Sequence, residues 1–208
     1  VAAVERFTTK RTVTKLDPLT APLAPRLIME QTRGRFDGPV TVTVLIPAYN
    51  EEDALRITLP SLLHQTRPPE RIIVVADNCT DGTRAVAEEF GVEAFETVAN
   101  TLKKAGALNQ VLEVVLPGQG NNDLVMVMDA DTALDAGFIE AAVERFVGDR
   151  ALMAVGGLFS GEEGHGMLGQ FQRNEYTRYS RVIRRRKGRV FVLTGTSSMF
   201  RPTALRAV

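Results

Sequence analysis

The sequence predicts an α/β domain with a mostly parallel, Rossmann-like sheet that carries helices on both faces. Strand-sized apolar runs alternate along the chain with amphipathic segments of ten or more residues. The apolar runs are continuous rather than alternating, as in strands that are buried on both sides. The chain has 208 residues, of which 44% are hydrophobic and 24% charged, which suits a soluble globular protein.

The order of the strands along the chain determines where the loops between them lie. Residues 1–39 contain Pro18, Pro22 and Pro25, so we expect an extended N-terminal arm with one helical turn near 27–31. Apolar, β-rich runs then predict strands at 42–46, 72–75, 92–95 and 124–128, within 152–159, and at 190–193.

Helices are predicted between these strands. The apolar spacing indicates helices around 55–63, after Asp81, at 108–115, at 138–146, at about 170–186 and from Thr203 onward. Asn50 and Asp81 are expected to cap the first two helices. Pro60 is expected to kink the first helix or to begin its second half, because proline has no amide hydrogen to donate.

Composition excludes several classes of function. The formal net charge is zero, so the whole molecule has no field that attracts nucleic acid or anionic lipid. Cys79 is the only cysteine, so an intrachain disulfide is excluded. No apolar run approaches the roughly 20 residues that span a bilayer, and we expect a cytoplasmic protein. His64 and His165 lie far apart in sequence, which disfavours zinc.

Polar clusters follow three of the predicted strands directly. They occupy residues 47–52, 77–81 and 129–131, and the last is Asp129-Ala130-Asp131. In open α/β sheets ligands bind beyond the carboxyl ends of the strands, so these clusters should share one edge. Crowded carboxylates repel one another unless a cation lies among them, and Mg²⁺ or Mn²⁺ prefers such oxygen ligands. Neither a dinucleotide-binding glycine motif nor a P-loop is present.

Each of these signals also has a plain structural interpretation. An Asp-x-Asp triplet is often a surface loop, although its position after the most apolar strand favours a site. Asp81 is more typical of a helix cap than of a ligand. Tyr49 would serve equally as a packed aromatic, and Cys79 as a small packing residue, since it has no basic neighbour in sequence.

Four segments together resemble glycosyltransferase family 2. They are residues 44–52, 75–83, 104–109 and 128–132, in that family's order and spacing, within a match that covers about 40–202. Within that family, the chain most resembles the branch of cellulose, chitin and poly-N-acetylglucosamine synthases and their soluble relatives. The resemblance implies a GT-A fold over residues 40–208, a UDP-sugar donor, inversion at the anomeric carbon and a role in polysaccharide biosynthesis.

The resemblance also implies roles for individual residues. The expected donor-binding residues are Ala48, Tyr49 and Glu51 beside the nucleoside, Asp77 on the uracil ring, Lys104 and Gly106 near the nucleotide, and Asp129 toward the ribose or sugar. Asp131, with Asp129 in the same motif, is expected to hold the Mn²⁺ or Mg²⁺ that bridges the diphosphate. Gly195 and Thr196 are expected to shape the site of the acceptor, a glycan or another hydroxyl compound.

The chain departs from the family at its end. A sugar hydroxyl is barely ionised at neutral pH and needs a general base, which the family supplies as an acidic motif after the segment around Thr196. Residues 197–208 contain no acidic side chain, and the chain has no tryptophan for the motif of processive members. We therefore expect the base beyond Val208 and mainly donor binding in this part.

Other functions stay open at this point. A nucleotidyltransferase also places acids at strand ends, but its first loop is glycine-rich and basic, whereas residues 47–52 are acidic. A binding module without catalysis is a third class. A basic run begins at Arg173 and ends at Arg189, with eight basic residues and one acidic. A solvated helix face is the favoured interpretation of this run, and contact with a membrane surface is the second. The glycine-rich residues 156–166 fit a mobile loop or a plain connection equally.

Overall fold

The computed structural model describes residues 38–120, 122–158 and 196–206, and in this part of the chain the predicted α/β class is confirmed. A six-stranded sheet has the order β3-β2-β1-β4-β6-β5. The first four strands are β1 (Thr41–Ala48), β2 (Arg71–Ala76), β3 (Glu93–Glu96) and β4 (Asp123–Met128), all parallel. β6 (Ser197–Phe200) runs antiparallel between β4 and β5 (Ala154–Gly156).

Helices connect the parallel strands, as right-handed crossovers require. The connecting helices are α3 (Glu52–Leu63), α4 (Thr83–Glu89) and α5 (Lys103–Val115), the last followed by the short 3₁₀ turn η1 (Leu116–Gly118). Two further helices come later: α6 (Phe138–Gly148) follows β4, and α8 (Pro202–Leu205) follows β6. Pro60 lies inside the last turn of α3, which continues to Leu63. Pro60 therefore does not begin a separate second half of that helix. In the described residues, no helix combines the length and the apolar character needed to cross a membrane.

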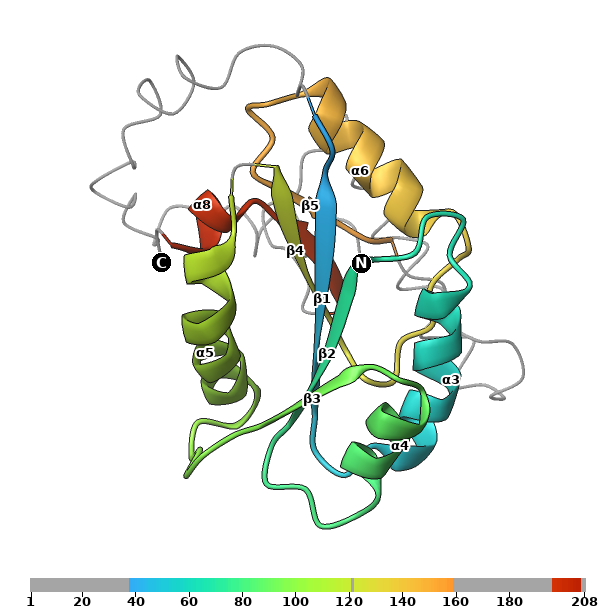
Figure 1. Cartoon of the computed structure of the whole chain (residues 1–208), viewed down its shortest axis with the longest axis vertical. Coiled ribbons are helices and arrows are strands. Elements are labelled where there is room, and N and C mark those ends of the chain that lie inside the picture. The colour runs from blue at the N-terminus through green and yellow to red at the C-terminus, as the bar shows by residue number, and fades with distance from the viewer. Residues whose placement is uncertain (1–37, 121, 159–195, 207–208) are drawn as a thin grey trace, which may run out of the picture.

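Two hydrophobic cores lie on opposite faces of the sheet. Val42, Val44 and Ile46 of β1 point to the face covered by α3, α4 and α6, while Leu45 points to the face covered by α5. Figure 1 shows this division, with α5 and the short α8 on one side of the strands and α3, α4 and α6 on the opposite side. Both faces of β1 are buried, which explains why its apolar run is continuous.

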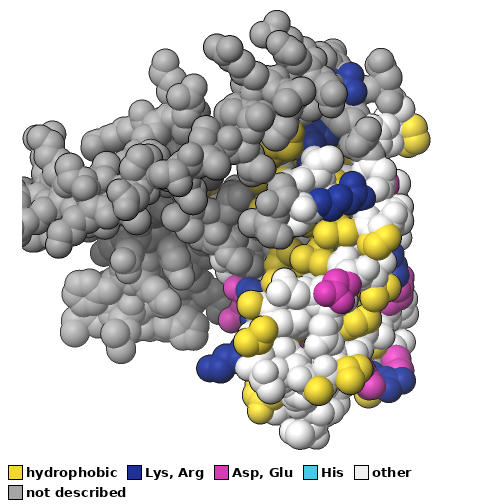
Figure 2. All heavy atoms as spheres, turned by 90° about the vertical axis from the view of Figure 1, so that its left-hand side faces the viewer, with side chains coloured by type: hydrophobic (Ala, Val, Ile, Leu, Met, Phe, Trp, Pro, Cys, Tyr) yellow, Lys and Arg dark blue, Asp and Glu magenta, His cyan; other side chains and the backbone are white. Residues whose placement is uncertain are grey.

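The outer face of α5 is turned to the viewer in Figure 2. Hydrophobic side chains are scattered there among polar atoms, with acidic and basic groups between them. Val114 of α5 and Val98 and Leu102 of the preceding loop are the strongly exposed large apolar residues in this region. Isolated exposed apolar side chains of this kind are normal on a protein surface.

Several predicted elements need correction or lie outside the described residues. The strand after Val92 is β3, one residue later than predicted, and the strand within 152–159 is the short β5. β6 was not predicted, because Ser197-Ser198-Met199-Phe200 is half polar. The N-terminal arm, the strand at 190–193, the basic run, His165 and Gly195 lie outside the described residues.

Candidate functional site

The carboxyl ends of the parallel strands bring the three polar clusters to one edge of the sheet. Ala48, the last residue of β1, pairs with Ala76, the last residue of β2, and Leu45 pairs with Val127 of β4. The amide of Asp77 donates to the carbonyl of Ala48 at 2.9 Å, which extends this pairing beyond the strands. The residues that follow β1, β2 and β4 therefore emerge together, as predicted.

Reciprocal hydrogen bonds join the first turns of α3 and α4. The Glu51 amide donates to Thr83 Oγ1 at 2.9 Å, and the Glu52 amide donates to Asp81 Oδ2 at 3.2 Å. In return, the Gly82 amide donates to Glu52 Oε2 at 2.7 Å. These bonds satisfy amides that a helix N-terminus leaves without partners. They also hold the loop after β1 against the loop after β2.

Asp81 belongs to this junction rather than to an open ligand site. Its Oδ1 accepts hydrogen bonds from the amide and the hydroxyl of Thr83, at 3.0 and 2.5 Å. Desolvation raises the pKa of Asp81, but the hydrogen bonds from Thr83 and from the Glu52 amide outweigh it and lower the pKa below its ordinary value. The predicted N-cap is therefore one residue early, because Gly82 holds that position, although the Asp81 carboxylate still accepts the amide of Thr83, the first residue of α4.

Asn50 does not cap α3, contrary to the prediction. Glu51 is the N-cap residue and makes no capping bond through its side chain. Asn50 instead adopts the left-handed region at φ 55°, and its Oδ1 accepts a bond from the Thr80 amide at 2.7 Å. Cys79 Sγ lies 3.3 Å from the Ala48 carbonyl, to which it donates. Beside this tied turn Tyr49 is 62% exposed, so its ring is available to a ligand rather than packed.

Asp77 is buried and firmly held. Its Oδ1 accepts three hydrogen bonds, from Thr97 Oγ1 at 2.7 Å, Asn100 Nδ2 at 2.8 Å and Asn78 Nδ2 at 3.1 Å. Asp77 is only 7% exposed. The three hydrogen bonds on Oδ1 compensate for the burial of this carboxylate and hold the side chain in one orientation.

Gly106 lies buried in α5 and makes room for Asn100. A Cβ at Gly106 would lie 2.0 Å from Asn100 Oδ1 and 2.8 Å from Leu102 Cβ. The same Asn100 oxygen accepts the amide of Leu102 at 3.0 Å, while the Asn100 amide group also donates to the Lys103 carbonyl at 2.8 Å. The absence of a side chain at Gly106 therefore makes room for the side chain of Asn100.

Lys104 and Asp129 form an ion pair between α5 and the end of β4. Both side chains keep contact with solvent, with 42% and 31% of their surfaces exposed. The amide of Asp129 donates to the carbonyl of Thr196 at 3.2 Å. The structure thus places Lys104, Asp129 and Thr196 together at the same edge.

Electrostatic repulsion acts between Glu51 and Asp131 at this edge of the sheet. The pKa of Glu51 is raised by desolvation and then by repulsion from Asp131, Asp81 and Asp129. Asp131 itself is exposed. The crowding of carboxylates that the sequence predicted is therefore present, and it favours the approach of a cation.

Polar side chains of α3 hold the loop that carries Asp131. Thr58 Oγ1 donates to the carbonyl of Ala130, and Ser61 Oγ accepts the amide of Leu134 at 3.2 Å. Gln65, two residues after the end of α3, accepts the Ile139 amide through its side-chain oxygen at 3.1 Å. Thr58 and Gln65 are buried. This role was not predicted, although polar residues with helical spacing beside the apolar positions of 55–63 were a usable signal.

No group of three or more His, Cys, Asp or Glu side chains in the described residues is arranged to hold a metal ion alone. A cation at this edge would therefore take one or two carboxylates, Asp131 first, and complete its ligand shell from another molecule. Mg²⁺ and Mn²⁺ commonly bind in this way, through one or two carboxylates and substrate phosphates.

Comparison with known proteins gives a consistent result. The model of the family described as Glycosyl transferase family 2 matches residues 43–208. A poly-beta-1,6-N-acetyl-D-glucosamine synthase from Staphylococcus epidermidis is 28% identical over 88% of this chain and 44% of its own length. The corresponding protein of Staphylococcus aureus strain MSSA476 is 29% identical over 79% of this chain and 40% of its own length. The chain thus spans less than half the length of these relatives.

Solved structures share the fold at lower identity. A mannosyltransferase from Pyrobaculum calidifontis in complex with GDP-Man and Mn²⁺ has a TM-score of 0.61 and 20% identity, over 89% of this chain and 53% of its own. Glucosyl-3-phosphoglycerate synthase from Mycobacterium tuberculosis, in complex with Mn²⁺, UDP and glucosyl-3-phosphoglycerate, has a TM-score of 0.56 and 18% identity, over 92% and 66%.

Proposed function

The chain belongs to glycosyl transferase family 2 and has the GT-A fold, and on this premise we propose that it forms the donor-binding part of a sugar transferase. The donor is a UDP-sugar. The acceptor is a hydroxyl group of a glycan or polysaccharide, and transfer inverts the anomeric carbon. These finer assignments extend the family's chemistry to the residues described above.

The observation that carries the proposal is the charge distribution at one edge of the sheet. Glu51, Asp129 and Asp131 come from two separate loops and repel one another there, and burial adds to this in raising the pKa of Glu51. Lys104 is paired with Asp129 at the same edge. A diphosphate could not approach these carboxylates alone, but a diphosphate with a divalent cation could.

The residues present fit a bound Mn²⁺ or Mg²⁺. Asp131 is exposed and its carboxylate makes no hydrogen bond or ion pair with the described residues, whereas Asp129 is already engaged by Lys104. We assign Asp131 as the metal ligand, with Asp129 oriented toward the ribose or sugar. When bound, the cation supplies Lewis acidity, which stabilises the charge that develops on the departing diphosphate.

The remaining donor-binding roles follow from the positions of the side chains. Asp77, held by three hydrogen bonds, offers a fixed acceptor to the nucleobase. Tyr49 is exposed beside Ala48 and Glu51, where it can cover the nucleoside. Lys104 adds a positive charge beside the diphosphate. Such groups bind without reorganising because the protein has already oriented them.

The acceptor side is incomplete in the residues described. Attack by a sugar hydroxyl requires a general base, and the described residues 196–206 contain no acidic side chain. We propose that the base belongs to a part of the protein beyond Val208. Thr196, bonded to Asp129 through its carbonyl, and Gly195 would border the acceptor. The chain by itself should therefore bind donor much better than it transfers sugar.

The test is a thermal shift with UDP and Mn²⁺. A ligand that binds only the folded state stabilises it by about 2.7 kcal/mol at a hundredfold excess over its Kd, or about 5–10 °C for a chain of this size. Asp131→Ala should abolish the part of the shift that needs Mn²⁺ and lower the affinity for UDP·Mn²⁺ by about tenfold or more. UDP and UDP-sugars at millimolar concentration without any shift would contradict the donor assignment.

A binding module without catalysis is the second candidate, because no acid is present among the described residues after Thr196. Release of sugar from UDP-sugars, measured with a longer form of the protein, separates the two. Transfer or hydrolysis supports the transferase, and tight donor binding without either supports the module.

A further inference from the structure

Donor binding leaves the choice of nucleobase open. Among the solved neighbours, one protein holds GDP-Man and another holds UDP, so the fold alone does not select between guanine and uracil. Resting on the proposed function, we propose that Thr97 and Asn100 act as positioning residues that bind one oxygen of Asp77 and thereby make the site selective for uracil over guanine.

The first step is the saturation of one carboxylate oxygen. Thr97, Asn100 and Asn78 all donate to Oδ1 of Asp77, at 2.7, 2.8 and 3.1 Å. A carboxylate oxygen has about two lone-pair sites. Oδ1 therefore has no capacity left for a hydrogen bond from a ligand.

Oδ2, the other oxygen of Asp77, differs from Oδ1 in its contacts. The hydrogen bonds that Asp77 accepts through its side chain in the described part of the chain all end on Oδ1, and none ends on Oδ2. The buried side-chain atoms without a partner are confined to Gln119 Oε1 and Arg150 Nε among the described residues. Asp77 Oδ2 is not one of them and so keeps access to solvent. Asp77 thus offers one acceptor, in one orientation, to a ligand.

The third step compares the bases. Uracil presents a single N–H donor between two carbonyl groups, and one acceptor oxygen satisfies it. Guanine presents two parallel N–H donors on the corresponding edge, and a carboxylate satisfies both only when both of its oxygens are available. With Oδ1 occupied, guanine would leave one N–H without a partner in a partly buried site, which is costly.

Asn100, one of the two positioning residues, is itself held by its neighbours. Asn100 donates to the Lys103 carbonyl and accepts the Leu102 amide, so its amide plane is fixed on both sides. Gly106 supplies the space for it, because a Cβ there would lie 2.0 Å from Asn100 Oδ1. Gly106→Ala must displace the Asn100 side chain, and the displaced side chain no longer reaches Asp77.

The experiment measures the affinities of the full 208-residue chain for UDP, GDP and inorganic pyrophosphate, each with Mn²⁺, by isothermal titration calorimetry. Because Asn78 and one remaining donor would still fill both sites of Oδ1, the test variants combine Thr97→Val with Asn100→Ala, or Thr97→Val with Gly106→Ala. We expect each double variant to narrow the preference for UDP over GDP by about tenfold, the equivalent of one charged hydrogen bond. Thr97→Ser in place of Thr97→Val keeps the hydroxyl and should restore the preference. Pyrophosphate lacks a base, so its affinity should stay within about twofold in every variant.

Gln110→Ala is the matched control. Gln110 binds the backbone of Val98 through two hydrogen bonds, at 2.9 and 3.0 Å, and so supports the same loop without touching Asp77. It should leave the UDP to GDP ratio unchanged. An unchanged ratio in both double variants, or equal narrowing in Gln110→Ala, overturns the positioning role. If the wild-type chain binds no nucleotide at all, the proposed function fails and this inference fails with it.

Discussion

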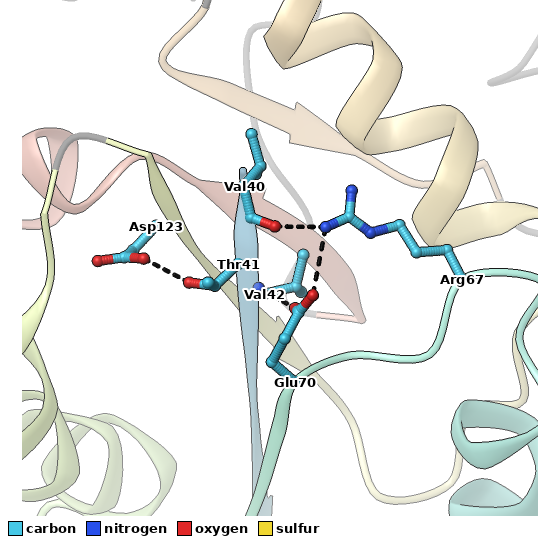
Figure 3. A network of polar contacts seen from close by, with 6 residues as sticks. All are labelled: Val40, Thr41, Val42, Arg67, Glu70 and Asp123. Carbon is cyan, nitrogen blue, oxygen red and sulfur yellow. Dashed lines mark hydrogen bonds and ion pairs between the residues drawn. The ribbon is translucent and has the colours of Figure 1, made fainter. Parts of the chain in front are cut away.

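The two ends of the same sheet are built in opposite ways. At the amino end the charged side chains are paired with one another or with backbone groups. Figure 3 shows part of this end, where Arg67 binds the Val40 carbonyl and Glu70, and Glu70 accepts the Val42 amide at 2.6 Å. At the carboxyl end, carboxylates from separate loops face one another and raise the pKa of Glu51 beyond what desolvation alone does.

Four arginines close the amino end. Besides Arg67, Arg71 forms a two-pronged ion pair with Glu93, with both contacts at 2.6 Å. Arg206 donates to the carbonyls of Leu116 and Gln119, at the start of η1 and just after it, at 2.6 and 2.7 Å. Arg201 is buried and donates to three carbonyls around the end of α6, at 2.8, 2.9 and 3.2 Å. Positive side chains favour the carboxyl ends of helices, so these contacts stabilise the fold.

Backbone strain is concentrated at the other end. The four non-glycine residues with positive φ in the described part of the chain are Asn50, Asn78, Ala99 and Lys103. Each follows the carboxyl end of β1, β2 or β3. Such conformations cost about 1–3 kcal/mol each and persist where the surrounding structure fixes them. The amino end of the sheet therefore stabilises the fold, whereas the carboxyl end is less stable in a way that suits a ligand site.

The largest loss of stability is expected from Arg201→Met, at the amino end of the sheet. It leaves the carbonyls of Phe146 and Leu152 without their donor in a buried place, and we expect a loss of about 3 kcal/mol in the free energy of unfolding, measured with urea. UDP affinity of the folded variant should not change. Arg206→Met, at an exposed position of the same end, is the control and should cost about 1 kcal/mol. A stable Arg201→Met variant with weakened UDP binding would contradict the comparison.

Ala99→Gly tests the backbone strain at the carboxyl end of the sheet. Alanine at φ 49° is strained, and glycine relieves about 1–2 kcal/mol at a cost of about 0.5–1 kcal/mol in chain entropy. We expect the variant to be more stable by about 0.5 kcal/mol in urea unfolding. The same change at Ala105, which is exposed inside α5, should instead destabilise by about 1 kcal/mol. Equal signs at the two alanines would remove the argument from strain.

Glu51→Gln should have the smallest effect. The pKa of Glu51 is raised in the folded state, so its ionised form costs stability, and the native state loses stability as the pH rises from about 4.5 through the folded pKa. Glutamine avoids this cost. Because the group is largely solvated, we expect a gain of only about 0.3 kcal/mol at pH 7. Melting curves should show that Glu51→Gln is no more stable than the wild type at pH 4. At pH 7 the stability gained by the variant should be smaller when Mn²⁺ is present. A gain in stability that does not depend on pH would exclude charge repulsion as its cause.

The sequence predicted the elements whose signal is local. β1, β2 and β4 are continuous apolar runs because both of their faces are buried, and α6 has clear helical spacing. The position of Asp77, Asp129 and Asp131 at one edge followed from the parallel order of the strands. β6 was missed because an antiparallel strand inserted late in the chain gains its stability from neighbours far away in sequence.

The parts of the site that could not be predicted depend on contacts across loops. Thr97 and Asn100 stand in a weakly patterned stretch, and nothing local shows that both point to Asp77. The expected cap at Asn50 was wrong because Thr80, 30 residues away, takes the side-chain oxygen instead. Lys104 and Asp129 were predicted for the same ligand, but their pairing with each other needed the packing of α5 against the sheet.

The hydrogen bond from the Gly157 amide to the Ser197 carbonyl, at 2.8 Å, has a consequence for how this protein family can vary. It holds Gly157 and Ser197 together at one point beside Asp129, whose amide donates to the Thr196 carbonyl. Closing a longer loop costs only about 0.6 kcal/mol for each doubling of its length. This point is therefore a natural graft junction, at which evolution or an engineer can exchange a whole insert while the donor half of the molecule stays as it is.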